Sequence, residues 1–337
     1  MIREAMLYEK IADNCVHCNL CAHGCIIKPG RRGVCGVREN KDGILYSLVY
    51  GTVIAEQIDP IEKKPFFHVY PGSKSYSVAA AGCNFSCEFC QNHEISQMPR
   101  TTRMIAGEEI QPAEIVAGAK KSGSKTIAYT YTEPTIYFEL AYETARIALL
   151  QGIKNVFVTN GFMSAETVEA IKPYLAAANV DLKSFREKFY RQQCGARLEP
   201  VLASLQKMKE SGVWVEITTL LIPGLNDSDD ELKDIAGFIA GLGKEIPWHI
   251  SRFHPQFKML NLPVTPVASL HRAREIGLLA GLKYVYNGNV PGEEGENTYC
   301  CSCGNCLIER YGFRVIKKNL NDNKCARCST ELEGIFN

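Results

Sequence analysis

The sequence lacks long apolar runs, and the charges of its 337 residues almost cancel. No stretch approaches the ~18 consecutive apolar residues that a membrane-spanning helix needs. The first residues, Met1-Ile2-Arg3-Glu4-Ala5, contain no apolar signal core. We therefore expect a cytoplasmic protein with no membrane partner. The formal net charge of +1 gives no electrostatic drive toward nucleic acid, so no nucleic-acid partner is expected.

Low-complexity segments, long linkers and internal repeats are also absent, which argues against disordered and repeat architectures. Hydrophobic residues make up 46% of the chain and charged residues 22%, so one large domain with small appendages can bury a sizeable core. We assign residues 1–72 to a cysteine-rich N-terminal domain, 73–290 to the core and 291–337 to a cysteine-rich tail.

The core region alternates apolar, β-prone runs with amphipathic segments. Strands separated by helical crossovers pair in parallel, and right-handed crossovers curl such a sheet toward a barrel. We therefore predict an α/β fold with a partial (β/α)6-type barrel, whose reactive residues gather at the carboxyl ends of about six parallel strands. The expected strands span residues 76–81, 126–133, 155–160, 180–183, 213–221 and 249–254, followed by a helix over 268–280 and a last strand over 284–286; a short strand is also expected in 46–51.

Cysteine, in contrast, is abundant, with fifteen residues in the chain. They form three groups, Cys15 to Cys35, Cys83 to Cys90 and Cys300 to Cys328, and only Cys194 stands alone. Without a secretory signal, such groups favour metal ligation over disulfides. A lone cysteine is most often a small core residue, so Cys194 is assigned no role.

The central group, Cys83, Cys87 and Cys90, has C-x3-C-x2-C spacing directly after a predicted strand. Three thiolates are one too few to close a four-iron, four-sulfur cluster, so one iron stays open for a substrate or cofactor. The alternative is a structural zinc knuckle in which His93 is the fourth ligand. The long β/α alternation that follows favours the cluster.

This motif, with Gly82 before it and Phe89 inside it, resembles the cluster loop of radical S-adenosylmethionine (SAM) enzymes. The lead-in from Asp59 to His68 is similar to that of the enzymes that activate glycyl-radical proteins, such as pyruvate formate-lyase. The resemblance is closest to the radical SAM member of the three-protein AmmeMemoRadiSam system, because both ends are cysteine-rich and Asn287 to Gly292 also matches.

The resemblance implies a set of cofactor-binding residues at successive strand ends. Glu133 stands in the place of a Gly-Gly-Glu-Pro motif that contacts the SAM amino group, although no glycine precedes it here. Val158 replaces an acid of the family, which puts a bound cation in doubt. Ordinary alternatives are a solvated strand end for Glu133, a plain salt bridge for Asp181 with Lys183, and a core histidine for His254. The implied SAM and cluster contacts are Cys83, Cys87, Phe89, Cys90, Thr132, Glu133, Asn160, Asp181, Lys183 and His254, with the three cysteines and Lys183 acting in catalysis.

The tail contains two C-x2-C knuckles about twenty residues apart, a spacing typical of zinc-ribbon or rubredoxin-like four-cysteine sites. We expect zinc rather than iron, although the spacing does not separate the two metals, and the resemblance implies Cys300, Cys303, Cys325 and Cys328 as the ligands. Pairing Cys303 with Cys306 instead of Cys300 is an open alternative.

The N-terminal cysteines, Cys15-x2-Cys18-x2-Cys21-x3-Cys25, have the spacing of a ferredoxin ligand run, although Ile26 replaces the usual proline and no second run follows. The resemblance implies that Cys18, Cys21, Cys25 and Cys35 are the metal ligands and that Cys15 is incidental. The metal is either zinc or an auxiliary iron-sulfur cluster.

The resemblance implies an oxidoreductase-like enzyme that works under anaerobic conditions. A ferredoxin or flavodoxin would reduce its cluster, SAM would be cleaved to a 5′-deoxyadenosyl radical, and the radical would abstract hydrogen from a small molecule, peptide or protein. One alternative is a glycyl-radical activase, and another is a noncatalytic iron-sulfur and zinc protein that carries electrons or acts as a scaffold. Companion proteins of the AmmeMemoRadiSam system are expected partners.

Overall fold

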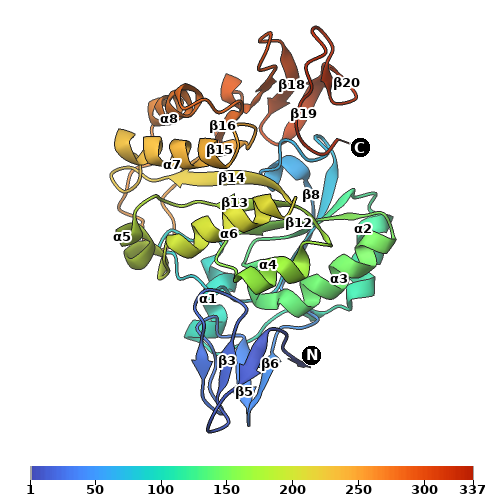
Figure 1. Cartoon of the computed structure of the whole chain (residues 1–337), viewed down its shortest axis with the longest axis vertical. Helices are drawn as coiled ribbons and strands as arrows, with labels where there is room; N and C mark the ends of the chain where they lie inside the picture. The colour runs from blue at the N-terminus through green and yellow to red at the C-terminus, as the bar shows by residue number, and fades with distance from the viewer. Residues whose placement is uncertain (1, 337) are drawn as a thin grey trace.

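An eight-stranded sheet forms the centre of the computed structural model, which describes residues 2–336 (Figure 1). The strand order is β16-β15-β14-β13-β12-β11-β9-β8. β8 pairs antiparallel with β9, and the other pairings of this sheet are parallel. The strands are β8 (Ala55–Pro60), β9 (Lys74–Ala79), β11 (Thr126–Tyr129), β12 (Lys154–Thr159), β13 (Leu175–Asp181), β14 (Trp214–Leu221), β15 (Trp248–Arg252) and β16 (Val285–Gly288).

Helices connect the parallel strands, as a β/α alternation requires. Polar side chains begin several of them: Ser164 accepts a hydrogen bond from the backbone N–H of Thr167, and Ser228 accepts one from that of Glu231. Figure 1 shows α7 and α8 beside β14, β15 and β16. The helices are α1 (His93–Thr101), α2 (Pro112–Lys121), α3 (Phe138–Leu150), α4 (Ala165–Ile171), α5 (Glu187–Phe189), α6 (Glu199–Glu210), α7 (Asp229–Leu242) and α8 (Val267–Leu279).

The predicted fold class is confirmed, but several predicted strand limits were wrong. The strand expected over 126–133 ends at Tyr129, because Tyr131 has a φ of +62°, which a strand cannot accommodate. The strand expected over 249–254 ends at Arg252, because the backbone N–H of Phe253 donates to the hydroxyl of Thr265. The fourth expected strand, 180–183, begins earlier, at Leu175, and ends at Asp181.

The N-terminal residues form two small sheets at one end of the molecule (Figure 1). One contains β1 (Arg3–Glu4), β6 (Ile44–Ser47) and β5 (Arg38–Lys41), and the other contains β2 (Tyr8–Lys10), β3 (Val16–Cys18) and β4 (Ile26–Ile27). The strand expected in 46–51 is β6 and ends at Ser47. We call residues 2–47 the N-terminal module. β8 follows this module in the chain. It lies within the range 1–72 predicted for the N-terminal domain, but it belongs to the central sheet.

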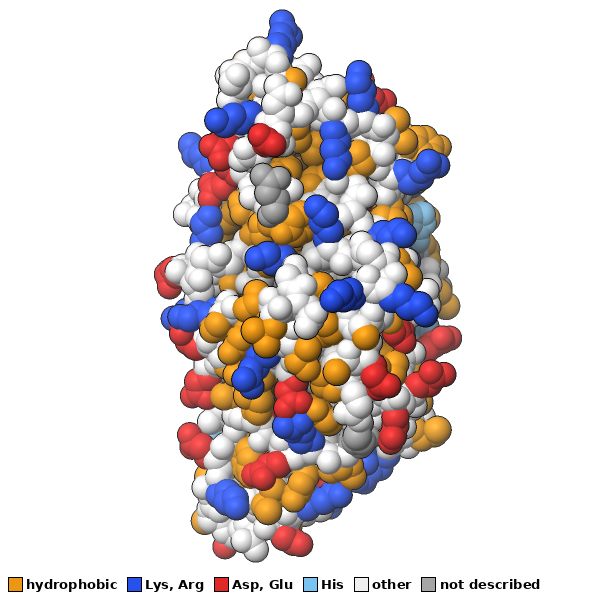
Figure 2. Space-filling view, turned by 90° about the vertical axis from the view of Figure 1, so that its right-hand side faces the viewer, with side chains coloured by type: hydrophobic (Ala, Val, Ile, Leu, Met, Phe, Trp, Pro, Cys, Tyr) orange, Lys and Arg blue, Asp and Glu red, His pale blue; other side chains and the backbone are white. Residues whose placement is uncertain are grey.

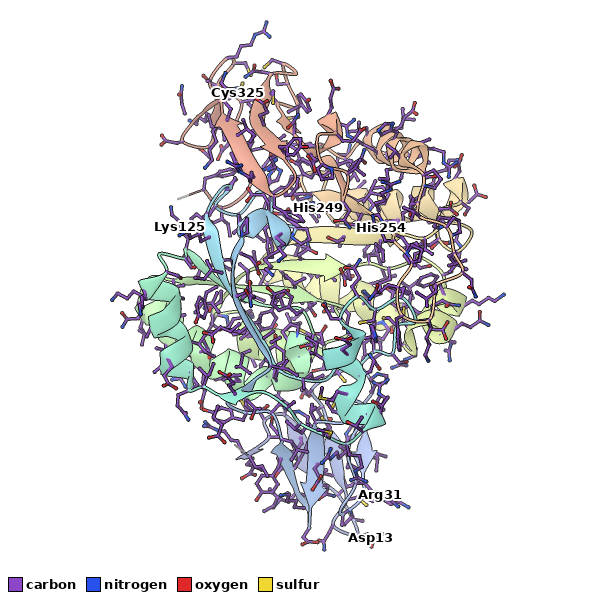
Figure 3. All side chains as sticks on the ribbon, turned by 180° about the vertical axis from the view of Figure 1, so that it is seen from behind. Asp13, Arg31, Lys125, His249, His254 and Cys325 are labelled. Carbon is purple, nitrogen blue, oxygen red and sulfur yellow. The ribbon has the colours of Figure 1, made fainter. Side chains whose placement is uncertain are left out.

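The tail lies at the opposite end (Figures 1 and 3). Its strands are β17 (Thr298–Tyr299), β18 (Cys306–Tyr311) and β19 (Arg314–Lys318) in one sheet and β20 (Leu320–Asn321) and β21 (Lys324–Cys325) in another. A further short pair joins β7 (Thr52–Val53) to β10 (Glu108–Glu109).

Among residues 2–336, no helix is both long and apolar enough to cross a membrane. On the face drawn in Figure 2, lysine and arginine side chains are distributed over the whole height of the molecule, with acidic side chains among them.

Arg310 attaches the tail to the core. Its guanidinium is buried, donates to the backbone oxygen of Phe67 (2.9 Å) and to the hydroxyl of Thr298 (2.7 Å), and lies 4.1 Å from the centre of the Phe67 ring. Glu62, also buried, is 3.8 Å from the same guanidinium. A buried charge with several partners is costly to remove, because those partners are left without compensation.

We expect Arg310→Met to lower the free energy of unfolding by about 3 kcal/mol, because Glu62 and the Phe67 carbonyl lose a buried partner. The shift in the urea-unfolding midpoint measures this loss. Arg314→Met is the matched control, since Arg314 is exposed, and surface changes of this kind usually stay within about 0.5 kcal/mol. Equal losses in both variants would contradict the role of Arg310.

Candidate functional site

A cavity of about 550 Å³ opens at the carboxyl ends of the parallel strands. The loop after β9, the ends of the following strands and the tail all contribute to its lining. Position at the carboxyl ends of parallel strands is typical of sites in β/α folds. Its walls include Cys83, Cys87, Phe89, Cys90, Thr132, Glu133, Asn160, Asp181, Lys183, Thr218, His249, Asn287 and Phe313.

The thiols of Cys83, Cys87 and Cys90 line one part of this cavity. The Cys83 sulfur accepts from the backbone N–H of Phe85 (3.3 Å) and faces the amide nitrogen of Asn160 (3.8 Å). The Cys90 sulfur lies 3.3 Å from the hydroxyl of Ser96. Hydrogen bonds of this kind orient cysteine sulfurs that bind metal.

The alternative with His93 as the fourth ligand of a zinc knuckle is not supported. The His93 ring stacks on Phe257 at 4.4 Å and does not line the cavity. A single zinc ion binds sulfur at about 2.3 Å, so its sulfur ligands must lie within about 4.6 Å of one another. Among residues 2–336, one group of three or more His, Cys, Asp or Glu residues has all of its ligand atoms within 4.8 Å of one another. This group lies in the tail.

The loop from Cys83 to Cys90 is held by a π-helical segment, Tyr190–Cys194. The backbone N–H groups of Ser86 and Glu88 donate to the carbonyls of Cys194 (2.8 Å) and Gln193 (2.9 Å). The buried Cys194 thiol hydrogen-bonds with Cys87, which raises the pKa of Cys87 together with burial. The sequence offered no signal for this role, because Cys194 belongs to no motif.

Glu133 is 2% exposed, so the expected alternative of a solvated strand end is wrong. Its Oε1 accepts from the hydroxyls of Thr135 (2.5 Å) and Thr159 (2.7 Å), and its Oε2 accepts from the backbone N–H of Asn160 (2.8 Å). Burial raises the pKa of Glu133, and these donors only partly offset the rise. A carboxylate oxygen can accept two hydrogen bonds, so Oε2 can take one more donor.

Asp181 and Lys183 form an ion pair on the cavity wall, with 2.8 Å between Oδ2 and Nζ. Burial alone would lower the pKa of Lys183, but the charge of Asp181 outweighs it and raises the pKa well above its ordinary value. The Lys183 ammonium lies 5.6 Å from the centre of the Phe89 ring. A carboxylate, an ammonium and an aromatic face therefore meet close to the cysteine loop.

The other part of the cavity is lined by Lys63, Lys64, His249 and Asn287. The Lys64 ammonium is buried, lies 2.7 Å from an Asp59 oxygen and sits 3.9 Å from the centre of the Tyr131 ring. Burial lowers the pKa of Lys64 to about 8, against the opposing effect of Asp59. The amide oxygen of Asn287 is buried without a hydrogen-bond partner.

His249, rather than the predicted His254, is the histidine of the cavity (Figure 3). His249 Nε2 lies 2.6 Å from Glu216, and the same carboxylate accepts the backbone N–H groups of Phe67 and His68. His254 follows the end of β15, is exposed and does not line the cavity. Both histidines lie in the predicted strand, so the choice depends on the buried Glu216 partner.

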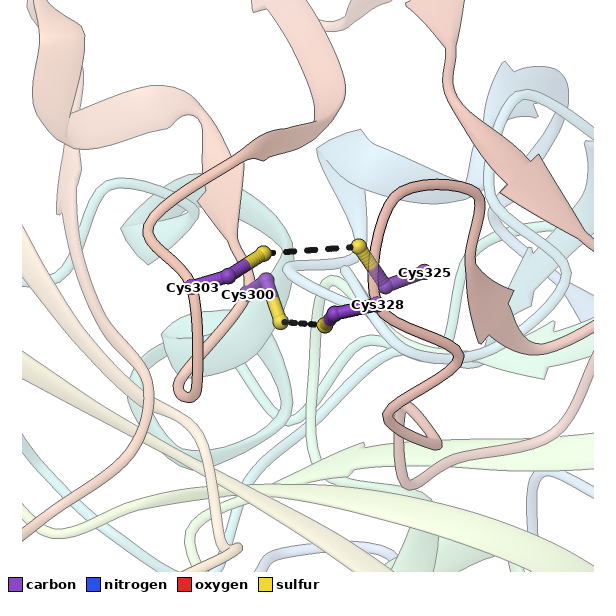
Figure 4. Close-up of side chains that lie close together, drawn as sticks. All are labelled: Cys300, Cys303, Cys325 and Cys328. Carbon is purple, nitrogen blue, oxygen red and sulfur yellow. Dashed lines mark hydrogen bonds between the residues drawn. The ribbon is translucent and has the colours of Figure 1, made fainter.

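The four tail cysteines meet as the knuckle spacing predicts (Figure 4). The sulfurs of Cys300 and Cys328 are 3.5 Å apart, and those of Cys303 and Cys325 are 3.7 Å apart. This geometry selects the pairing of Cys300 with Cys303 and excludes the alternative with Cys306, which begins β18. The group can hold one tetrahedral ion.

Comparisons with known proteins give the family context. A sequence model of the radical SAM superfamily matches residues 78–239. The chain is 47% identical over 335 residues to an uncharacterized protein, MJ0808, of Methanocaldococcus jannaschii, across 98% of this chain and 99% of that protein. It is 29% identical over 167 residues to the GTP 3′,8-cyclase of Aquifex aeolicus, across 48% of this chain and 51% of the cyclase. A radical SAM methyltransferase structure from Sphaerobacter thermophilus shares the fold, with a TM-score of 0.50 and 17% identity over 67% of this chain and 71% of that chain.

We expect Cys303→Ser to abolish stoichiometric metal binding in the tail, because a tetrahedral site needs all four thiolates. Cys301→Ser is the control, since Cys301 is exposed and lies outside the group. Elemental analysis of both variants, prepared in a Cys83/Cys87/Cys90→Ala background, counts bound zinc and iron. Unchanged metal content in Cys303→Ser would refute the site.

Proposed function

The chain belongs to the radical SAM superfamily, and we propose that it reductively cleaves SAM at a four-iron, four-sulfur cluster held by Cys83, Cys87 and Cys90. When bound, this pair of cofactors supplies a 5′-deoxyadenosyl radical that abstracts hydrogen from a substrate. The single observation that carries the proposal is that three thiols, a carboxylate with one free acceptor site and an ion pair line one cavity.

The residues fit the cofactors in number and chemistry. Three thiols leave one iron without a protein ligand, and the spread of their sulfurs beyond single-ion distances supports a larger group. Glu133 Oε2 can accept from the SAM ammonium, and Lys183 can pair with the SAM carboxylate. Phe89, Thr132, Asn160 and Asp181 line the same space, so they complete the proposed site.

We propose a small molecule or a peptide as the substrate. The tail supports this, because Gly312 and Phe313 line the cavity and so narrow the space that a protein loop would need. Lys63, Lys64 and His249 provide cationic and hydrogen-bonding groups on the substrate side. Water would compete inside such a site, and the covering tail also helps to exclude it.

The cluster needs an external one-electron reductant, which we propose is a ferredoxin or flavodoxin. Zinc in the tail is proposed as a structural ion, because this small module has little core of its own. The companion proteins of the AmmeMemoRadiSam system remain proposed partners. The three domains are proposed with the limits 1–72, 73–290 and 291–337, although β8, within the first range, belongs to the central sheet.

Replacement of Cys83, Cys87 and Cys90 together by alanine should abolish SAM cleavage, because the cluster loses all of its protein ligands. Anaerobically reconstituted protein is reduced, and 5′-deoxyadenosine is measured by chromatography. Cys301→Ser should keep the wild-type rate. SAM cleavage by the triple variant at the wild-type rate would sink the central assignment.

The substrate class is tested by following the hydrogen atom that the 5′-deoxyadenosyl radical abstracts. With a deuterated small-molecule or peptide substrate, deuterium should appear in 5′-deoxyadenosine, and no lasting protein radical should accumulate. A glycyl-radical activase would instead leave a persistent radical on a partner protein, detected by electron paramagnetic resonance (EPR). An electron carrier would produce neither signal. A persistent glycyl radical on a partner would overturn the small-molecule or peptide proposal.

A further inference from the structure

The N-terminal module brings four cysteines together. The backbone N–H of Cys18 donates to the carbonyl of Cys25 (2.9 Å), Cys21 lies on the loop between them, and the Cys25 sulfur lies beside Gly33, two residues before Cys35. Cys18 is buried and the other three are partly buried. The loops that carry them have almost no regular structure beyond two- and three-residue strands, so their arrangement needs support from elsewhere.

The spacing of these four sulfurs differs from that in the tail. The tail sulfurs all lie within 4.8 Å of one another, as a single tetrahedral ion requires. In the N-terminal module, no three of the four cysteines meet that limit, although all its residues from 2 onward are described. A four-iron, four-sulfur cluster places iron and sulfide between its ligands, so its cysteines lie further apart than those of zinc. Among residues 2–336, the tail cysteines are therefore arranged for a single ion, and the N-terminal cysteines are not.

A buried cation faces the N-terminal thiols. Arg38 is 1% exposed, and its Nη1 lies 3.8 Å from the sulfur of Cys18 and 3.0 Å from the carbonyl of Met6. Its other nitrogen forms a buried ion pair with Glu139 of the core helix α3. Hydrogen bonds to ligand sulfurs are one means by which proteins adjust cluster potentials.

The N-terminal cysteines lie directly behind the loop that carries Cys83. Arg100 donates to the carbonyl of Val34, the neighbour of Cys35, and to the carbonyl of Cys83, both at 3.1 Å. His23 Nε2 lies 2.8 Å from the carbonyl of Asn84, the residue after Cys83. Arg100 and His23 therefore each connect the N-terminal cysteine loops to the loop that carries Cys83 through a single side chain.

Gly82 allows this close approach. It has a φ of +112°, and a side-chain carbon there would lie 2.8 Å from Val37 and 3.4 Å from the Cys35 carbonyl. Only glycine avoids both the backbone strain and this clash. The backbone of the Cys35 loop therefore packs directly on the backbone that leads into Cys83.

We propose that Cys18, Cys21, Cys25 and Cys35 hold a second four-iron, four-sulfur cluster, which passes electrons to the cluster at Cys83, Cys87 and Cys90. The relay part rests on the proposed function. One electron leaves a reduced flavodoxin-class protein and reduces the N-terminal cluster. The same electron then moves to the second cluster, the N-terminal cluster returns to its oxidised state, and the electron is consumed in the cleavage of one SAM.

The identity of the N-terminal metal is tested in the full-length Cys83/Cys87/Cys90→Ala variant, which leaves the N-terminal module unchanged. After anaerobic reconstitution it should retain about four iron and four sulfide, as one cluster requires, and give a four-iron Mössbauer spectrum. Adding Cys35→Ala should remove that iron, whereas adding Cys15→Ala should not. Zinc in this variant that is lost with Cys35→Ala, and no iron, would overturn the proposal, whatever the outcome at Cys83.

The relay is tested with wild-type protein, and the Cys83/Cys87/Cys90→Ala variant serves only to identify the signal of the N-terminal cluster. The protein is mixed with photoreduced flavodoxin and frozen at successive times for EPR. The signal of the N-terminal cluster, identified from the triple variant and insensitive to SAM, should appear before the SAM-sensitive signal and decay as 5′-deoxyadenosine forms. Earlier reduction of the SAM-sensitive cluster would refute the relay. Absence of any SAM-sensitive signal would instead contradict the proposed function and, with it, the relay.

Discussion

The loop from Cys83 to Cys90 has no helix or strand of its own, so its conformation depends on hydrogen bonds from other parts of the chain. The π-helical segment at Tyr190–Cys194 binds one side through backbone carbonyls, and Arg100 and His23 bind the other. Irregular backbone must have its polar groups satisfied in this way when it is buried. The rest of the molecule positions the residues that make these contacts.

The same segment also fixes the end of β13. The hydroxyl of Tyr190 accepts the backbone N–H of Lys183 at 3.1 Å, so one irregular turn positions both the cysteine loop and the lysine of the ion pair. A π-helical turn is a rare and costly element, and it is often found at functional sites. Here its irregularity places two carbonyls where the Cys83 loop needs acceptors.

The sequence predicted the parallel sheet because its strands are apolar runs between amphipathic segments, and this pattern depends only on burial. It did not predict where β11 ends, because the positive φ of Tyr131 is set by contacts with Asp59 and Lys64 on another strand and turn. The choice of His249 over His254 required Glu216, which is more than thirty positions away in sequence. Spacing alone could not separate Cys300 from Cys306, because both form C-x2-C pairs with Cys303.

The two cysteine-rich modules lie at opposite ends of the molecule (Figures 1 and 3), and the tail, unlike the N-terminal module, contributes residues to the lining of the central cavity. The N-terminal module packs behind the cysteine loop through Cys35 and Gly82, whereas the tail contributes Phe313 to the far wall. A radical enzyme has two opposing needs, since its electron source must come close to the cluster while its reactive space must stay closed to water. Separate modules at the two ends can meet both needs, because neither has to open for the other to work.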